Sequence, residues 1–85
     1  MPRWKLLHIG FEGDEVLIGS ANVWTHTWID AGEGSITVPH PSYPSQSHRM
    51  YIYKLDTPEG FKRFAAGEFS NSVWGIYIEE DGSCS

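Results

Sequence analysis

The chain has 85 residues, of which 14% are aromatic and 20% are charged, and its formal net charge is −5. This length fits one domain, and the aromatic content excludes an intrinsically disordered chain. With 6 Lys and Arg against 11 Asp and Glu and no basic cluster, the charge pattern argues against nucleic acid as a partner and favours a basic protein.

Strand-forming segments dominate the first part of the chain. Residues 4–11 and 15–19 are predicted as a hairpin, because the Glu12-Gly13-Asp14 segment between them has the composition of a tight turn. Val23 to Asp30 is predicted as the third strand, since it is rich in β-branched and aromatic residues. Alternation along this strand would place four side chains on one face, namely Trp24, His26, Trp28 and Asp30. A short fourth strand is predicted at residues 35–38.

The segment from Pro39 to His48 has a different character. Its three prolines remove backbone donors and favour extended geometry, so an ordered loop is predicted rather than a strand. At about ten residues it is near the upper length for a connection without secondary structure, and such loops often carry function. His40 and His48 bracket the loop and would approach each other if it closes, with Tyr43 docked on the domain.

Three further strands are predicted in the second half of the chain, at residues 49–55, 62–69 and 73–80. Thr57 and Pro58 are residue types that often begin a helix. A short helical turn near 57–62 is therefore an alternative for the connection that precedes the strand at residues 62–69. The total of six to seven strands at regular spacing predicts a mainly β fold. We expect a single antiparallel β-barrel or sandwich over residues 1–81, with a flexible tail at 82–85.

Location is constrained by what the sequence lacks. The single cysteine, Cys84, cannot form an internal disulfide. No segment has the length and apolar character of a membrane span, and the first residues do not have the pattern of a signal peptide. We therefore expect a cytoplasmic protein that does not contact a membrane.

Two groups of residues are candidates for a site. The tryptophan face of Trp24 and Trp28 would stack a sugar, a base or a cation if exposed, and would fill the core if buried. The histidines His26, His40 and His48 with Glu68 would give a metal or acid–base site, although their spacing is not that of known metal motifs. If the face of Glu68 is buried, its carboxylate needs a partner.

The sequence contains no nucleophile elbow, phosphate-binding loop or cysteine pair. We therefore predict a non-enzymatic binding or protein-interaction module with no cofactor and no assigned metal. Its partner would be an unknown protein or a small ligand, and a homodimer is left open. The alternatives are a small histidine–carboxylate metal protein or enzyme, and a carbohydrate or aromatic-ligand binder. The predicted contact residues are Trp24, His26, Trp28, Asp30, His40, Tyr43, His48 and Glu68.

Overall fold

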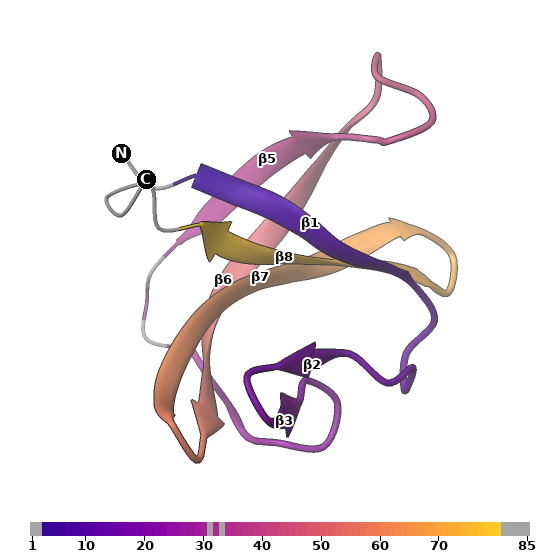
Figure 1. The fold of residues 1–85 in the computed structure, drawn as a ribbon. Coiled ribbons are helices and arrows are strands. Elements are labelled where there is room, and N and C mark those ends of the chain that lie inside the picture. The colour runs from indigo at the N-terminus through magenta and orange to yellow at the C-terminus, as the bar shows by residue number, and fades with distance from the viewer. Residues whose placement is uncertain (1–2, 31, 33, 81–85) are drawn as a thin grey trace.

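One antiparallel sheet of six strands forms most of the protein (Figure 1). The computed structural model describes residues 3–30, 32 and 34–80, so the predicted tail at 82–85 lies outside the described residues. The sheet strands are β1 (Arg3–Gly10), β4 (Trp28–Ile29), β5 (Ser35–Pro39), β6 (Ser47–Thr57), β7 (Gly60–Ser70) and β8 (Val73–Glu80). A separate pair consists of β2 (Leu17–Ile18) and β3 (Ala21–Asn22). The mainly β, antiparallel, single-domain prediction is confirmed.

The order of strands in the sheet is β1-β8-β7-β6-β4, and β5 also pairs with β6. The first half of β6 pairs with β5 and the second half with β4, so one edge of this long strand has two successive neighbours. Within the described ranges no pairing joins β1 to β4 or β5, and no closed barrel is formed. In the same ranges no helix has the length and apolar character to cross a membrane.

The connection between β6 and β7 is a two-residue turn at Pro58 and Glu59. The Thr57 hydroxyl accepts a hydrogen bond from the Glu59 N–H and donates one to the Gly60 carbonyl. Gly60 has a φ of 111°, a backbone angle that residues other than glycine rarely adopt. Thr57 thus stabilises a β-turn instead of capping a helix, and the helical turn considered for residues 57–62 is not found.

The strand predicted over Val23 to Asp30 is wrong for its first five residues. The N–H groups of Thr25 and His26 both donate to the Asn22 carbonyl, which makes a turn, and only β4 at the end of the segment is extended. The Asn22 side chain reinforces this turn by accepting a hydrogen bond from the Trp24 N–H at 3.1 Å. Asparagine favours such local bonds over a sheet ladder, and this preference outweighs the β-rich composition.

Two hydrophobic clusters lie on opposite faces of the sheet. The tryptophan cluster is covered by the segment around β2 and β3, which lies inside the curve of the sheet in Figure 1. Its buried residues are Val16, Ala21, Val23, Leu55, Phe64, Ala66 and Ile76, with Trp24, Trp28 and Trp74 packed against them. The Met50 cluster lies on the other face, and its buried residues are Val38, Met50, Ile52, Ala65, Phe69 and Tyr77. Neighbouring residues such as Phe64 and Ala65 enter different clusters, as expected for strands covered on both faces.

Two glycines make room for the large side chains of the Met50 cluster. Gly67 and Gly75 are direct partners on β7 and β8. A Cβ atom at Gly67 would lie 2.6 Å from the Met50 sulfur, and one at Gly75 would overlap the Phe69 ring. The absence of both side chains therefore allows Met50 and Phe69 to lie against the backbone of the sheet.

Replacing Gly75 by alanine is expected to lower the free energy of unfolding by about 1–3 kcal/mol, because the added methyl group overlaps the Phe69 ring. Urea unfolding followed by tryptophan fluorescence measures this change. The same substitution in a Phe69→Leu background is the control, since the smaller side chain leaves space for the methyl group. An equal cost in both backgrounds would show that the ring is not the cause.

Candidate functional site

The indoles of Trp24 and Trp28 are half-buried in the tryptophan cluster. Their ring centroids are 5.4 Å apart, and Trp28 also contacts Tyr53 and Phe64 at centroid distances of 5.1 and 5.0 Å. The Trp28 indole N–H donates to the Val23 carbonyl. Because aromatic rings pack around both indoles, the structure places these two predicted contact residues in the interior packing of the domain.

His26 and Asp30 are not brought together with the tryptophans. Both side chains are exposed, because the turn at residues 23–27 breaks the alternation that would have aligned them. The His26 Nδ1 atom lies 3.3 Å from the Asn22 carbonyl oxygen, and Asp30 accepts a hydrogen bond from the Gly32 N–H at 3.0 Å. Each side chain therefore makes a local hydrogen bond within its own turn.

The loop between β5 and β6 does bring His40 and His48 together. Their ring centroids are 5.5 Å apart, and Phe69 contacts both of them at 5.1 and 5.3 Å. Tyr43 lies against His40 at 5.0 Å and keeps 60% of its surface exposed. We call these four residues the loop cluster. Three of them were predicted from the sequence, and Phe69 was missed as a member because it lies on β7, outside the loop, and reaches the histidines only through the fold of the sheet.

Backbone hydrogen bonds fix the shape of this loop. The His40 N–H donates to the Gln46 carbonyl at 2.9 Å, and the Gln46 N–H donates to the Tyr43 carbonyl at 2.9 Å. The His40 Nδ1 atom accepts a hydrogen bond from the Ser42 N–H at 3.0 Å, which fixes the orientation of this ring. The predicted ordered loop is therefore present at residues 40–46, with Tyr43 held at its tip, whereas Pro39 and His48 belong to the flanking strands β5 and β6.

The histidine pair does not have the surroundings of a metal centre. Among the residues that the structure describes, no three His, Cys, Asp or Glu side chains come close enough to hold a metal ion. The His48 Nε2 atom is buried and has no hydrogen-bond partner among the described residues. The His48 ring lies beside the Phe69 ring, in an apolar environment. Packing is the role that the structure shows for this pair.

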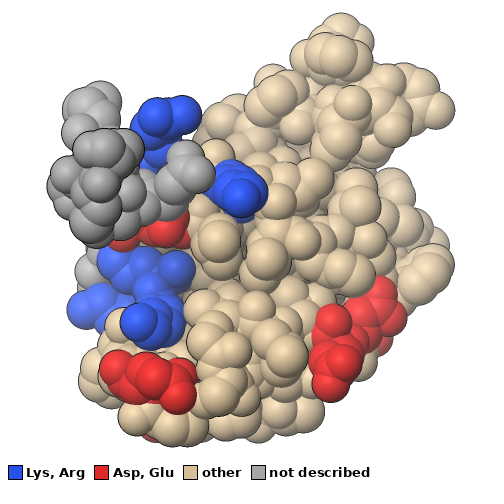
Figure 2. Space-filling model, viewed as in Figure 1, with Lys and Arg blue, Asp and Glu red and all other residues tan. Residues whose placement is uncertain are grey.

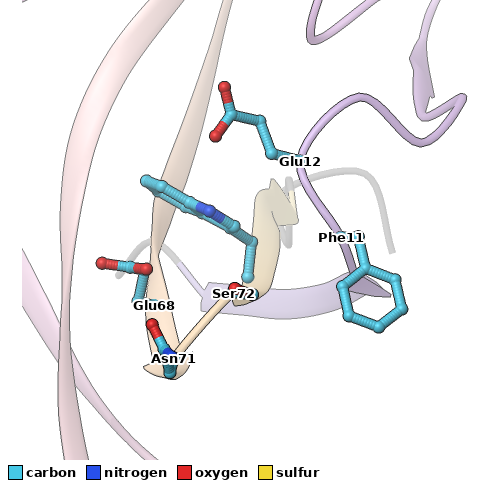
Figure 3. A pocket seen from close by; sticks show the side chains of 6 residues that line it. Phe11, Glu12, Glu68, Asn71 and Ser72 are labelled. Carbon is cyan, nitrogen blue, oxygen red and sulfur yellow. The ribbon is translucent and has the colours of Figure 1, made fainter.

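Glu68 lies apart from the loop cluster and lines an open pocket of about 300 Å³ at the end of the β7–β8 hairpin. Figure 3 shows Glu12 and Glu68 both at this pocket, Asn71 and Ser72 in the turn below, and the Phe11 ring directed away. The partly buried indole of Trp74 completes the lining. Because the lining comes from segments more than fifty positions apart, only Glu68 had been singled out from the sequence.

The electrostatics of this pocket are negative. In the described part of the chain neither Glu12 nor Glu68 makes an ion pair, and Figure 2 shows acidic side chains with no Lys or Arg beside them over the β1–β2 connection. Carboxylates next to an indole suit a cationic group, which is attracted by both the charge and the ring. The pocket is therefore better matched to an ammonium or guanidinium group than to an anion.

A hydrogen bond between His8 and Asp14 fixes the connection that carries Phe11 and Glu12. The His8 Nε2 atom lies 3.0 Å from the Asp14 Oδ2 atom, and the same oxygen accepts a hydrogen bond from the Phe11 N–H at 2.8 Å. The side-chain bond from His8, followed by the backbone bond from Phe11, lowers the pKa of Asp14 below its ordinary value of 3.8. The ionised form of Asp14 is thus the one that holds this connection.

Comparison of the chain with protein families, curated proteins and solved structures finds no significant match.

Replacing Ser72 by glycine is expected to raise the free energy of unfolding by about 0.5–1 kcal/mol. Ser72 has a φ of 72°, and this left-handed conformation costs a residue other than glycine about 1–2 kcal/mol. This cost is larger than the conformational entropy that a glycine at this position loses on folding. Urea denaturation measures the difference. Ser70→Gly in the adjoining strand is the control and should destabilise, so a loss of stability in both variants would refute this account of Ser72.

Replacing Asp14 by asparagine is expected to lower stability at neutral pH. A carboxylate whose pKa is depressed in the folded state stabilises above its unfolded pKa, near 3.8, and this contribution disappears as the pH falls through the lower folded value. The difference between wild type and variant should therefore shrink in acid, as measured by urea midpoints from neutral pH down to about pH 2. Glu15→Gln is the control, and a difference that stays constant over this range would argue against the linkage.

Proposed function

We propose that this protein is a small, non-enzymatic interaction module and that Tyr43, at the tip of the β5–β6 loop, is its main contact with a partner protein. The observation that carries the proposal is a tyrosine 60% exposed on a loop of fixed shape, with its ring against His40. Exposed aromatic residues held in this way are enriched among the residues that dominate binding energies. Tyrosine also adds a hydroxyl group that bonds to polar groups at the edge of a contact.

The fixed shape of the loop favours binding. The backbone bonds of His40 and Gln46 close the loop, and the Phe69 ring supports both histidines from the buried side. A loop that is ordered before binding loses less conformational entropy when a partner docks. Three prolines, at positions 39, 41 and 44, restrict the backbone further.

The composition of this surface fits the centre of a protein–protein interface. Residues 35–48 contain no Asp, Glu, Lys or Arg, and the upper part of the molecule that includes the β5–β6 loop shows no charged side chain in Figure 2. Interface cores are depleted in charged residues and enriched in aromatic ones. The loop cluster therefore has the composition expected of a contact centre.

The net charge suggests the charge of the partner. Glu68 and Phe69 are neighbours on β7, but the pocket lies on the face of the tryptophan cluster and the loop cluster lies on the face of the Met50 cluster. With a net charge of −5 for the whole chain, a partner that carries basic side chains would associate faster. We propose a basic protein as the partner.

The two alternative functions have less support. A histidine–carboxylate site would need a third ligand beside His40 and His48, and the described residues supply none. Ligand stacking on Trp24 and Trp28 would need free ring faces, whereas rings of the tryptophan cluster pack against both. The interaction module is therefore the function that the geometry supports best.

The proposal predicts that a photo-reactive phenylalanine analogue at position 43 cross-links a partner protein in the source cells, more strongly than the same analogue at position 51. Tyr51 is the matched control, since it is 51% exposed on β6 and outside the loop cluster. With the purified partner, Tyr43→Ala should weaken binding about thirtyfold in calorimetry, as expected for a dominant contact. Tyr51→Ala should leave it unchanged.

Circular dichroism and thermal melting of both alanine variants show whether the fold is retained. Cross-linking that is no stronger at position 43 than at position 51 would overturn the proposal. Equal affinities of a folded Tyr43→Ala variant and the wild type would do the same.

A further inference from the structure

Another open pocket, of about 340 Å³, lies where β7 begins and β8 ends. Its lining is half apolar and half charged, and consists of Ile18, Phe61, Ile78, Lys62, Arg63 and Glu79. Phe69 and the loop cluster lie at the other end of β7. We call this second site the lysine pocket, and it is separate from the contact proposed around Tyr43.

Hydrogen bonds between Ser20 and Glu59 fix the wall of the lysine pocket that comes from β2. The Ser20 hydroxyl and N–H donate to the two carboxylate oxygens of Glu59, at 2.7 and 3.3 Å. These bonds, and more weakly the charge of Lys62, lower the pKa of Glu59 below its ordinary value of 4.5. They also join the β2–β3 turn to the β6–β7 turn, so Ile18, two residues before Ser20, is held beside the start of β7.

The basic residues of the chain gather at this end of the sheet. The start of β1, the end of β6 and the start of β7 meet here through their pairing, and they carry five of the six Lys and Arg residues, namely Arg3, Lys5, Lys54, Lys62 and Arg63. Figure 2 shows Lys and Arg side chains on the side of the molecule where β1 begins and β8 ends. A chain with a net charge of −5 thus concentrates its cations in one region.

Two lysines give the lysine pocket its positive charge. The one carboxylate in the lining, Glu79, accepts a hydrogen bond from the Arg63 guanidinium at 2.6 Å and is neutralised by it. Lys62 lines the pocket, and Lys5 is the β1 partner of Ile78, so its side chain leaves the sheet on the same face as Ile78. Both lysines are exposed, and neither makes an ion pair within the described part of the chain.

We propose that the lysine pocket binds a small carboxylic acid in its ionised form. The hydrocarbon part of the ligand lies against Ile18, Phe61 and Ile78, and its carboxylate lies at the Lys62 ammonium group. Phe61 is 61% exposed, so a ligand covers apolar surface that water otherwise contacts. The volume is at the lower end of the range for small-molecule sites, which suits a ligand with one ring or a short chain.

Titration of the isotope-labelled full chain with 4-phenylbutyrate tests the proposal. The matched probes 4-phenylbutanol and 4-phenylbutylamine carry the same hydrocarbon part with a neutral and a cationic head group. Amide shifts in two-dimensional NMR spectra give each dissociation constant and locate the site. We expect shifts centred on residues 61–63 and 78–79, with the acid binding about threefold more tightly than the alcohol and the amine binding more weakly than either.

Two variants separate the contribution of the charge from that of the apolar contact. Lys62→Gln should remove most of the preference for the acid over the alcohol, because the ammonium group is lost. Phe61→Ala should weaken the acid and the alcohol to the same extent, because both lose the same apolar contact. Arg49→Gln and Tyr51→Ala are the matched controls, since both residues are exposed on β6 and outside the pocket, and neither should change an affinity.

Three results would overturn the proposal. The first is an affinity for the amine equal to that for the acid, and the second is a preference for the acid that Lys62→Gln retains in full. The third is an absence of shifts at residues 61–63 and 78–79 with all three probes up to their solubility limits. None of these results involves Tyr43, so this inference is tested separately from the proposed function.

Discussion

The burial of both faces of the β6–β7 hairpin is the constraint on which the rest of this structure depends. Each strand has 11 residues, and successive side chains enter different clusters, so that Leu55 and Phe64 pack on one face while Ile52 and Ala65 pack on the other. A domain of this size buries a modest share of its surface, and a sheet used on both faces builds two clusters from one set of strands. The segment around β2 and β3 is needed because one of these faces would otherwise be exposed.

This constraint also positions the loop cluster. Phe69 is buried in the Met50 cluster because Gly75 leaves space beneath its ring. The outer side of that ring then supports His40 and His48, and His40 in turn supports Tyr43. The exposed tyrosine is therefore connected to the interior of the sheet through a continuous series of aromatic contacts, which is why its loop holds one shape without secondary structure of its own.

Most of the strands could be predicted from the sequence, and the errors have identifiable physical causes. Apolar patterning and turn composition located β1, β5, β6, β7 and β8 to within a few residues. The hairpin predicted for residues 4–11 and 15–19 is wrong, because β1 pairs with β8 and β2 pairs with β3. The segment from Val23 to Thr27 was misassigned because the local hydrogen bonds of Asn22 outweighed β propensity. Thr57 and Pro58 are residue types that often begin a helix, but here they form a β-turn. The positive φ of Gly60 is incompatible with a helix at this position.

The candidate site was less predictable, because it depends on contacts between distant segments. The approach of His40 to His48 could be predicted, since both flank one loop. The pocket of Glu68 could not, because Glu12 reaches it only through the fold of β1 against β8. Alternation alone also left open which face of each strand is inward. Both faces of the central strands are buried, so a side chain on these strands is exposed only near the strand ends. The residues proposed as partner contacts, Tyr43 and Glu68 among them, lie at those ends, where the two clusters stop and side chains reach solvent.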